Sequence, residues 1–392
     1  MSQIVKTLVA MNAFKDAPDD VVAINQAAAE VLKQLGHTTK ICPVADGGTG
    51  TLEAFRYHAE TKGGQEQEAI VKDPLGKNIT AKWLHLPVTN TAIIAMEKAS
   101  GLPLVEVEKR NPLVTSSYGT GQLIQAAIDK GCKTILLTIG GSATVDGGIG
   151  MLRALGAEFK DANGGELMGS GADLEHVASI NLDKVRKTLG DVKIVALSDV
   201  KTPWKAANPM EGVLFYAPQK FRERGDFSGN AKLALERGVE NFAKVVDALA
   251  GRKASIETST GAAGGLVYIP VAALGTKVSG GFDHLEKMFS LEAQVKESDV
   301  IITGEGRLDK TTFEGKAPAA IIELARNNKK PVVFICGSVD DTIDWKERGI
   351  NMVIKIKPDN MALPEAIKKT TSLIENSLKE KAQVIAALHK AS

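Results

Sequence analysis

Two short stretches carry the same glycine-rich pattern around an aspartate, Ala45-Asp-Gly-Gly-Thr-Gly50 and Val145-Asp-Gly-Gly-Ile-Gly150. The second follows a β-branched run and precedes a helical pattern from Ile149 to Leu155. Glycine lets a turn point backbone N–H groups outward, and the start of a helix adds a positive dipole. The pattern predicts loops that hold an anion such as phosphate, with contacts from Asp46, Gly47, Gly48, Gly140, Gly141, Ser142, Thr144, Gly147 and Gly148.

Charged residues also follow the ends of predicted strands. Lys15 comes after a strand at 5–11, and Asp199 after a strand at 194–197. A strand at 299–303 precedes Glu305, Arg307 and Asp309. In open α/β sheets, ligands bind beyond the carboxyl ends of the strands. Carboxylates, permanent cations and glycine loops without paired histidines suit phosphoryl transfer.

Phosphoryl transfer usually needs Mg²⁺, which takes one or two protein carboxylates plus water and substrate phosphates. No dense ligand motif is therefore expected, and Asp46, Asp146 and Asp309 are the candidate ligands. A simpler interpretation stays open for all these residues. Each aspartate could be a turn or helix-capping residue, and each cation could be a solvated surface side chain.

Three familiar catalytic or nucleotide-binding motifs are absent from the sequence. It has no G-x-x-x-x-G-K-[ST], no G-x-G-x-x-G after the first strand, and no G-x-S-x-G. These absences exclude a P-loop protein and count against a Rossmann dehydrogenase and a serine hydrolase.

Strands and helices alternate at both ends of the chain, which is the pattern of a parallel sheet with crossover helices. The predicted C-terminal elements are a strand at 299–303, a helix at 317–326, a strand at 331–336, a helix at 341–348, a strand at 351–355 and a helix at 364–388. The middle begins instead with paired strands at 68–71 and 79–86 around a turn. We expect a discontinuous doubly wound (Rossmann/flavodoxin-like) α/β domain from 1–65 plus 290–392. A second α/β domain is inserted at 66–289, with the active site in the cleft between the two.

The composition narrows the class of protein. The chain has 392 residues, a formal net charge of +1 and 24% charged residues, a balance that favours neither nucleic acid nor membrane partners. It has no run of about 18 apolar residues and no signal-peptide pattern. Its three cysteines lie far apart, as expected of buried reduced thiols. We expect a cytoplasmic enzyme that acts on a small molecule, with a homodimer left open as its assembly.

Further motifs run through the chain in order: Phe14-Lys15, Ala45-Asp-Gly-Gly48, Ala99-Ser-Gly-Leu102, Arg110-Asn-Pro-Leu113, Tyr118-Gly-Thr-Gly121, Gly140-Gly-Ser-Ala-Thr144, Asp199-Val200, Pro218-Gln-Lys220, Gly261-Ala-Ala-Gly-Gly265, Thr303-Gly-Glu-Gly-Arg-Leu-Asp309 and Gly315-Lys316. In this series the chain resembles the bacterial glycerate kinases of the glycerate 2-kinase type. The resemblance implies two α/β domains and ATP-dependent phosphorylation of D-glycerate, with 2-phosphoglycerate as the expected product. ATP and Mg²⁺ are the implied cofactors.

The resemblance also implies roles for the candidate residues. Asp199 would orient or deprotonate the acceptor hydroxyl. Lys15 and Arg307 would face the transferring phosphate or the substrate carboxylate. The three candidate ligands named above would help to hold Mg²⁺, directly or through water.

Some positions depart from the family's pattern, namely Asn12, Ala13, Asp16, Ala17, Thr49, Val145 and Thr202. Asn12 stands where the family has aspartate, Asp16 where it has glycine, and Val145 where it has asparagine. Because several changes remove polar groups from presumed cleft loops, either the substrate is a different, closely related small hydroxy acid or the activity is weakened or lost. Two other interpretations stay open: a binding protein with altered or lost catalysis, and hydrolysis or isomerisation of a phosphate ester.

Overall fold

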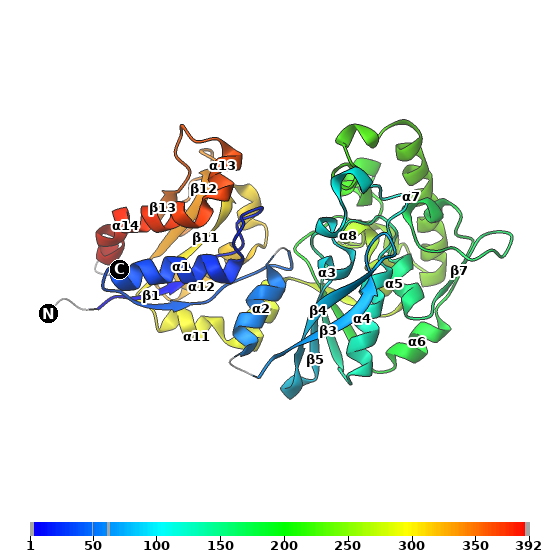
Figure 1. Cartoon of the computed structure of the whole chain (residues 1–392), viewed down its shortest axis with the longest axis horizontal. Coiled ribbons are helices and arrows are strands. Elements are labelled where there is room, and N and C mark those ends of the chain that lie inside the picture. The colour runs from blue at the N-terminus through cyan, green and yellow to red at the C-terminus, as the bar shows by residue number, and fades with distance from the viewer. Residues whose placement is uncertain (1–3, 49, 61–62, 389–392) are drawn as a thin grey trace. The chain divides into compact units, whose positions relative to one another are not determined.

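The computed structural model describes residues 4–48, 50–60 and 63–388 (Figure 1). Thr49, one of the departures named above, lies outside these ranges. The chain divides into two compact units, called here unit 1 (Met1–Thr61 and Gly280–Ser392) and unit 2 (Lys62–Ser279). Unit 1 is thus built from both ends of the chain. The predicted α/β fold class is confirmed.

Unit 1 contains a parallel sheet in the order β13-β12-β11-β1-β2. Its strands are β1 (Lys6–Val9), β2 (Thr38–Ile41), β11 (Val300–Leu308), β12 (Val332–Val339) and β13 (Met352–Lys355). The central strands are runs of buried apolar residues, as expected of a sheet covered on both faces. This is the flavodoxin-like strand order, in which ligands bind where the order reverses. In unit 1 the reversal lies between β1 and β11.

Helices pack against this sheet. On one face α1 (Val21–Gln34) and α14 (Thr370–Leu388) contact each other, as Figure 1 shows. The Asp20 carboxylate begins α1 by accepting a hydrogen bond from the Ala23 N–H at 2.9 Å. The other helices of unit 1 are α2 (Thr51–Glu60), α10 (Gly281–Phe289), α11 (Leu291–Lys296), the 3₁₀ helix η9 (Lys310–Phe313), α12 (Ala317–Asn327) and α13 (Leu363–Lys368).

Helix α10 lies in unit 1, whereas the expected boundary at 289/290 puts its residues in the inserted domain. The Gly281 N–H donates to the Asp46 C=O at 3.1 Å. The ring of Phe289 meets that of Phe55 in α2, with centroids 6.0 Å apart. These contacts hold α10 against the N-terminal segment. Because they join residues far apart in the chain, no local sequence pattern predicts them.

Strands β11 and β12 run further than the sequence predicts. The predicted end of β11 is Thr303, but the strand continues to Leu308 because its residues from 304 onward stay paired with β12. Glu305 and Arg307 are therefore strand residues rather than loop residues. Since they are two positions apart, their side chains leave the strand on the same side.

The predicted helix at 341–348 is wrong, because this segment forms a series of turns. The Asp340 carboxylate accepts a hydrogen bond from the Thr342 N–H at 3.0 Å, and Asp344 accepts one from the Lys346 N–H at 3.1 Å. Aspartate side chains that bind nearby N–H groups compete with helical backbone bonds. The predicted helix at 364–388 is likewise interrupted at Lys369, between α13 and α14.

Unit 2 contains a sheet in the order β10-β9-β6-β5-β4-β3. β3 (Gln65–Lys72) and β4 (Asn78–Leu86) form the predicted antiparallel pair. The other four strands are parallel to one another, so their carboxyl ends share one edge. The remaining strands of unit 2 are β5 (Thr91–Ala95), β6 (Thr134–Thr138), β9 (Lys193–Leu197), β10 (Lys277–Ser279) and the separate pair β7 (Glu158–Lys160) and β8 (Ser179–Asn181).

The helices of unit 2 and this sheet enclose a large apolar core. They are α3 (Glu97–Ser100), α4 (Tyr118–Asp129), α5 (Ile149–Ala154), α6 (Asp183–Leu189), α7 (Gly229–Ala250), α8 (Ala262–Gly265) and α9 (Tyr268–Ala273). The 3₁₀ helices are η1 (Pro87–Thr89), η2 (Leu102–Leu104), η3 (Val107–Lys109), η4 (Gly171–Glu175), η5 (Pro209–Glu211), η6 (Val213–Lys220), η7 (Arg224–Asp226) and η8 (Ala254–Ile256).

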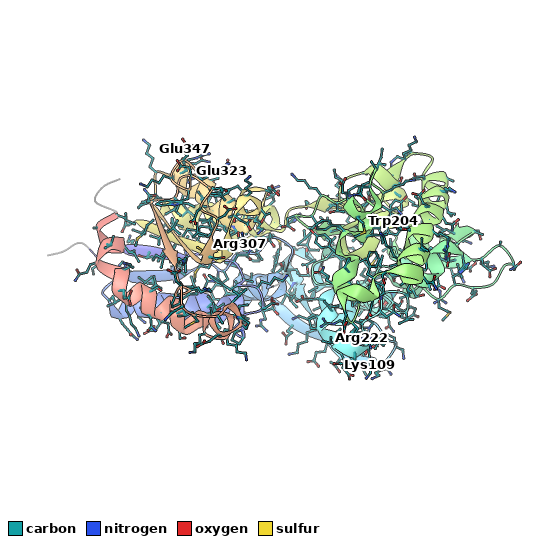
Figure 2. All side chains as sticks on the ribbon, turned by 90° about the horizontal axis from the view of Figure 1, so that it is seen from above. Lys109, Trp204, Arg222, Arg307, Glu323 and Glu347 are labelled. Carbon is teal, nitrogen blue, oxygen red and sulfur yellow. The ribbon has the colours of Figure 1, made fainter. Side chains whose placement is uncertain are left out.

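Trp204 lies at the centre of this core (Figure 2). Its indole stacks on the Tyr268 ring at 5.0 Å between centroids, and its Nε1–H donates to the Val239 C=O at 3.1 Å. Gly265 packs so tightly against Trp204 that a Cβ there would lie 2.2 Å from the indole. The glycine-rich segment at 261–265 is therefore needed for close packing.

Gly264→Ala should lower the free energy of unfolding by roughly 2–5 kcal/mol. Gly264 has a φ of 69°, and an added Cβ would lie 2.0 Å from the Thr144 C=O. Gly275 is a matched control, because its φ is 72° and a Cβ there would meet nothing within 4 Å. Gly275→Ala should cost only about 1–2 kcal/mol. Chemical denaturation of both variants measures the difference, and equal losses would contradict the packing argument.

The three cysteines are free and buried, as predicted. In the part of the chain that the structure describes, no helix combines the length and hydrophobicity needed to span a membrane.

Candidate functional site

In unit 2 the predicted anion loop after β6 is occupied by a carboxylate of the chain itself. The buried Asp146 side chain accepts hydrogen bonds from the Ser117 N–H at 2.8 Å and the Ser117 hydroxyl at 2.6 Å. It also accepts from the N–H groups of Gly148 at 3.2 Å and Gly150 at 3.3 Å. Burial raises the pKa of Asp146 against the opposing effect of these donors. A phosphate would need the same N–H groups, and a metal-ligand role does not fit this geometry.

The later part of this loop serves packing. A Cβ at Gly147 would lie 2.4 Å from the Phe242 ring, and one at Gly148 would lie 2.3 Å from the Leu266 C=O. The Val145 side chain is fully buried in the core of unit 2. This departure therefore contributes to the packing of unit 2, and its effect on the choice of substrate stays a prediction. Helix α5 is also only six residues long, so its N-terminus makes no anion site.

The beginning of the loop differs, because Gly140 and Gly141 reach the surface. Behind them Lys220, at the end of η6, holds the loop in place. Its ammonium donates to the Ser142 hydroxyl at 2.7 Å and to the Thr144 C=O at 2.6 Å. The Thr144 hydroxyl is buried without a hydrogen-bond partner among the described residues. Lys220 thus fixes the part of the loop that directly follows Gly140 and Gly141.

Lys220 is only 3% exposed, which is rare for a lysine. Burial lowers the pKa of Lys220 to about 7, against the opposing effect of the negative charge of Asp146. The side chain therefore changes its charge near neutral pH. Groups with such displaced pKa values gather at functional sites.

The free energy of unfolding should depend on pH through Lys220. The pKa of this lysine is about 7 in the folded protein and 10.5 in the unfolded chain, so between these values the unfolded state binds more protons. Stability should therefore rise with pH in this window, by up to about 1.4 kcal/mol per pH unit. Below the folded-state pKa the full cost of burying the charge is present.

Lys220→Met should remove this slope in chemical denaturation between neutral and mildly alkaline pH. Lys205→Met is the control, because the Lys205 side chain is 40% exposed and pairs with Glu240 at the surface. Equal slopes in the unmodified protein and in Lys220→Met would show that Lys220 does not titrate in this range.

Asp199 lies in the loop after β9, at the same edge of the sheet as the loop after β6. It is partly exposed. Burial raises the pKa of Tyr216 in η6, and the negative charge of Asp199 adds to the rise, so the two side chains are close. The Ser198 N–H anchors the loop to the Ser279 C=O at 3.0 Å.

In unit 1 a cavity of about 340 Å³ lies at the carboxyl ends of β1, β11 and β12, where the strand order reverses. We call it the unit 1 cavity. One side is charged and the other is apolar. The charged side includes Lys15, Glu305, Arg307, Asp309 and Lys316, and the apolar side includes Phe14, Ile356, Leu363, Ala366, Ile367 and Leu373.

Glu305 places a buried carboxylate on this cavity, and the residue is 7% exposed. Its Oε2 accepts a hydrogen bond from Lys316 Nζ at 3.1 Å, whereas Oε1 has no partner among the described residues. Burial raises the pKa of Glu305 against the opposing charge of Lys316, and the negative charge of Asp46 adds to the rise. An unpaired buried oxygen is costly, so Oε1 is suited to a cation or a hydroxyl group of a ligand.

Three further cations line the same cavity, namely Lys15, Arg307 and Lys357. Arg307 Nε lies 3.3 Å from Asp309 Oδ2, while Asp309 Oδ1 caps η9 by accepting from the Thr311 N–H at 2.9 Å. Asp309 therefore orients Arg307, which is labelled in Figure 2. Lys15 is exposed, and nothing in the described ranges pairs with its ammonium. The cavity thus carries an uncompensated positive charge.

Asp46 is a buried aspartate beside β1. Its Oδ2 accepts a hydrogen bond from the Asn12 amide at 3.0 Å, and its Oδ1 accepts one from the Gly48 N–H at 3.1 Å. The turn needs glycine at Gly47, where φ is 108°. The family that this chain resembles has aspartate at the position of Asn12. This chain therefore has one negative charge fewer beside Asp46.

The other departures have different surroundings. Ala13 lines the unit 1 cavity, and Ala17 packs against the core of unit 1. Asp16 has a φ of 65°, which explains the family's glycine there, although aspartate tolerates this region better than most residues. Thr202 contributes its backbone, since its C=O accepts from the Gly261 N–H at 3.0 Å.

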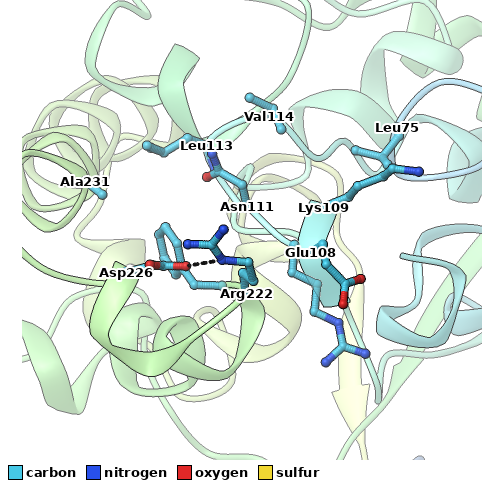
Figure 3. Close-up of a pocket in the computed structure, with 11 residues that line it drawn as sticks. Leu75, Glu108, Lys109, Asn111, Leu113, Val114, Arg222, Asp226 and Ala231 are labelled. Atoms are coloured by element: carbon cyan, nitrogen blue, oxygen red, sulfur yellow. Dashed lines mark hydrogen bonds and ion pairs between the residues drawn. The ribbon is translucent and has the colours of Figure 1, made fainter. Parts of the chain in front are cut away.

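A larger hollow, of about 590 Å³, lies in unit 2 and is drawn in Figure 3. Two of its cations, Lys109 and Arg222, are already paired with carboxylates at the surface. Arg222 Nε lies 3.5 Å from Asp226 Oδ2, and Lys109 pairs with Glu106. Such surface pairs are worth little, so size alone does not make this hollow the ligand site.

The two units together define an α/β protein with a cationic cavity at a strand-order reversal and a polar strand edge held by a buried lysine. The sequence model described as "Glycerate kinase family" matches residues 7–386. The chain belongs to the glycerate kinase family and is an enzyme of that family, as predicted.

Named relatives are similar over nearly the whole chain. A glycerate kinase of Bacillus subtilis is 33% identical over 379 residues, which cover 96% of each chain. A glycerate 2-kinase of Escherichia coli is 34% identical and covers 93% of each chain. A crystal structure described as a glycerate kinase 2 from Salmonella typhimurium LT2 has a TM-score of 0.79 at 30% identity, covering 98% of this chain and 99% of that one.

Two candidate residues were missed by reasoning from the sequence, Lys220 and Lys316. Both stand in motifs that support the resemblance, Pro218-Gln-Lys220 and Gly315-Lys316. The motifs gave no sign that one lysine is buried and that the other pairs with Glu305. These contacts join residues far apart in the chain, and only the folded structure shows them.

Proposed function

We propose that this protein transfers a phosphoryl group from ATP to D-glycerate, giving 2-phosphoglycerate and ADP. The observation that carries this proposal is the unit 1 cavity, where Lys15, Arg307 and Lys316 are collected at the strand-order reversal. Such a set of cations suits the phosphate groups of a nucleotide. Membership of the glycerate kinase family supports glycerate as the acceptor.

The residues of the unit 1 cavity fit a Mg²⁺ ion. The unpartnered Oε1 of Glu305 and the nearby Asp46 carboxylate offer the one or two oxygen ligands that Mg²⁺ usually takes from protein. Within the described ranges no set of three or more side chains could hold a metal alone, so the nucleotide phosphates would complete the coordination. Bound there, Mg²⁺ would neutralise charge on the transferring group. Asp146 has no part in this proposal.

The chain's own residues would do the remaining work. Lys15 and Arg307 bind and orient the phosphates, and Asp309 holds Arg307 in position. Asp199 accepts the proton that the glycerate hydroxyl loses as its oxygen bonds to the γ-phosphorus, while the bond to ADP breaks. Lys220 fixes Ser142 and Thr144, whose loop would contact the substrate.

A second candidate is suggested by Asn12 and Ala13. Asn12 lowers the negative charge beside Asp46, and Ala13 lines the unit 1 cavity where the family has a hydroxyl. Both changes alter the surroundings of the ligand. A related small hydroxy acid as the substrate, or a binding protein with weakened catalysis, would follow from them. The cytoplasmic location and the homodimer stay predictions.

ADP release from purified protein, with D-glycerate and a panel of related hydroxy acids, tests the proposal. Release should depend on both ATP and D-glycerate. Calorimetry with each compound separates the alternatives, because a binding protein would take up ligand without turnover. Phosphate release or product formation without ATP would instead indicate a hydrolase or an isomerase.

A further inference from the structure

Glycerate would make no favourable contact with the apolar side of the unit 1 cavity. Leu363, Ala366 and Ile367 line the cavity from one face of α13, because they are three and four positions apart. Leu373, near the start of α14, also lines it. Leu363 is 59% exposed. Glycerate is a three-carbon acid with two hydroxyl groups and has no apolar surface to lay against these side chains. The opposite side carries cations, so the full occupant must be apolar at one end and anionic at the other.

We propose that the unit 1 cavity is the nucleotide site, with the adenine base against Leu363 and Ile367 and the phosphates toward Lys15 and Arg307. The inference rests on the proposed function and assigns the nucleotide to unit 1. A volume of about 340 Å³ exceeds what a three-carbon acid fills and falls within the range of roughly 300–1,000 Å³ usual for small-molecule sites. The position of the cavity also agrees with this assignment, because doubly wound sheets bind nucleotides where the strand order reverses.

The charges of the cavity favour this orientation. Arg307 and Lys316 are partly neutralised by Asp309 and Glu305. The ammonium of Lys357 donates to the Pro358 C=O at 3.3 Å, whereas nothing in the described ranges pairs with Lys15. The anionic end of a ligand therefore belongs at the β1 and β11 side. This leaves the apolar side chains of α13 and α14 for the base, which has flat apolar surfaces.

Calorimetry on the full chain tests the site with three probes, namely a non-hydrolysable ATP analogue, inorganic tripolyphosphate and D-glycerate. Leu363→Ser should weaken binding of the ATP analogue by about tenfold or more, because the base loses an apolar contact. Binding of tripolyphosphate and of D-glycerate should be unchanged. Val384→Ser is the matched control, since Val384 is an apolar residue of α14 that is 51% exposed and lies outside the cavity. Because both side chains are largely exposed, neither substitution should unfold the protein.

Lys15→Ala should weaken the binding of the ATP analogue and of tripolyphosphate to a similar extent, because it removes a contact with the phosphates. The proposal is overturned if Leu363→Ser keeps full affinity for the ATP analogue, or if this variant instead loses affinity for D-glycerate. In either case the unmodified protein could still phosphorylate glycerate, so the proposed function would survive. If the unmodified protein neither binds the nucleotide nor turns over substrate, the nucleotide-site proposal and the proposed function are both overturned. An azidoadenine analogue of ATP should label a peptide from α13 or α14.

Discussion

Asp199→Asn is expected to lower kcat with D-glycerate by at least about a hundredfold. Asparagine keeps the shape of the side chain but cannot accept the proton of the acceptor hydroxyl. The position supports the role, since Asp199 follows β9 at the edge where the loop fixed by Lys220 also lies. Steady-state kinetics measures the loss, and the KM for ATP should change little.

Asp191→Asn is the matched control for this prediction. Asp191 is exposed and precedes β9, at the opposite end of the same strand from Asp199. Its replacement should leave kcat within about twofold, because it is remote from the proposed chemistry. Near-normal turnover in Asp199→Asn would remove this aspartate from the mechanism.

The second large effect is expected from Lys15→Ala, which should lower kcat/KM by about two to three orders of magnitude. The ammonium has no partner in the described part of the chain, so its removal leaves no buried charge unpaired. The fold should therefore remain intact, and the loss should appear in catalysis alone. Lys33→Ala on the exposed face of α1 serves as the control, because Lys33 forms only a surface pair with Glu30 at 3.9 Å.

A thermal unfolding curve for each variant completes the test of Lys15. Unchanged unfolding with a large loss of kcat/KM is the expected combination. Equal kinetics for Lys15→Ala and Lys33→Ala would mean that Lys15 is a solvated surface residue, which is the simpler interpretation of its sequence.

Much of the fold can be predicted from the sequence, because local patterns specify many of its elements. The apolar spacing of Val21 to Leu35 and the cap at Asp20 define α1, and the turn at Asp73 defines the β3–β4 pair. The patterns fail where side chains compete with the backbone. At 341–348 a helical composition forms turns, because Asp340 and Asp344 bind neighbouring N–H groups.

The candidate site shows a different limit. A glycine-rich turn next to an aspartate has the same composition whether it binds a ligand or binds that aspartate. In the Asp146 loop the carboxylate takes the N–H groups, with help from Ser117, which is 29 residues away in the sequence. The burial of Lys220 and the pairing of Lys316 with Glu305 likewise depend on contacts between distant segments. Sequence reasoning can supply such residue types but not these partners.

The central claim is that the protein joins a phosphoryl group of ATP to a hydroxyl group of glycerate. Phosphorus NMR of the purified protein with ATP, Mg²⁺ and D-glycerate tests it most directly. The account predicts one new phosphomonoester signal, that of 2-phosphoglycerate, growing in step with ADP. No phosphomonoester from D-glycerate or from any related hydroxy acid, with the protein folded and ATP present, would contradict the account.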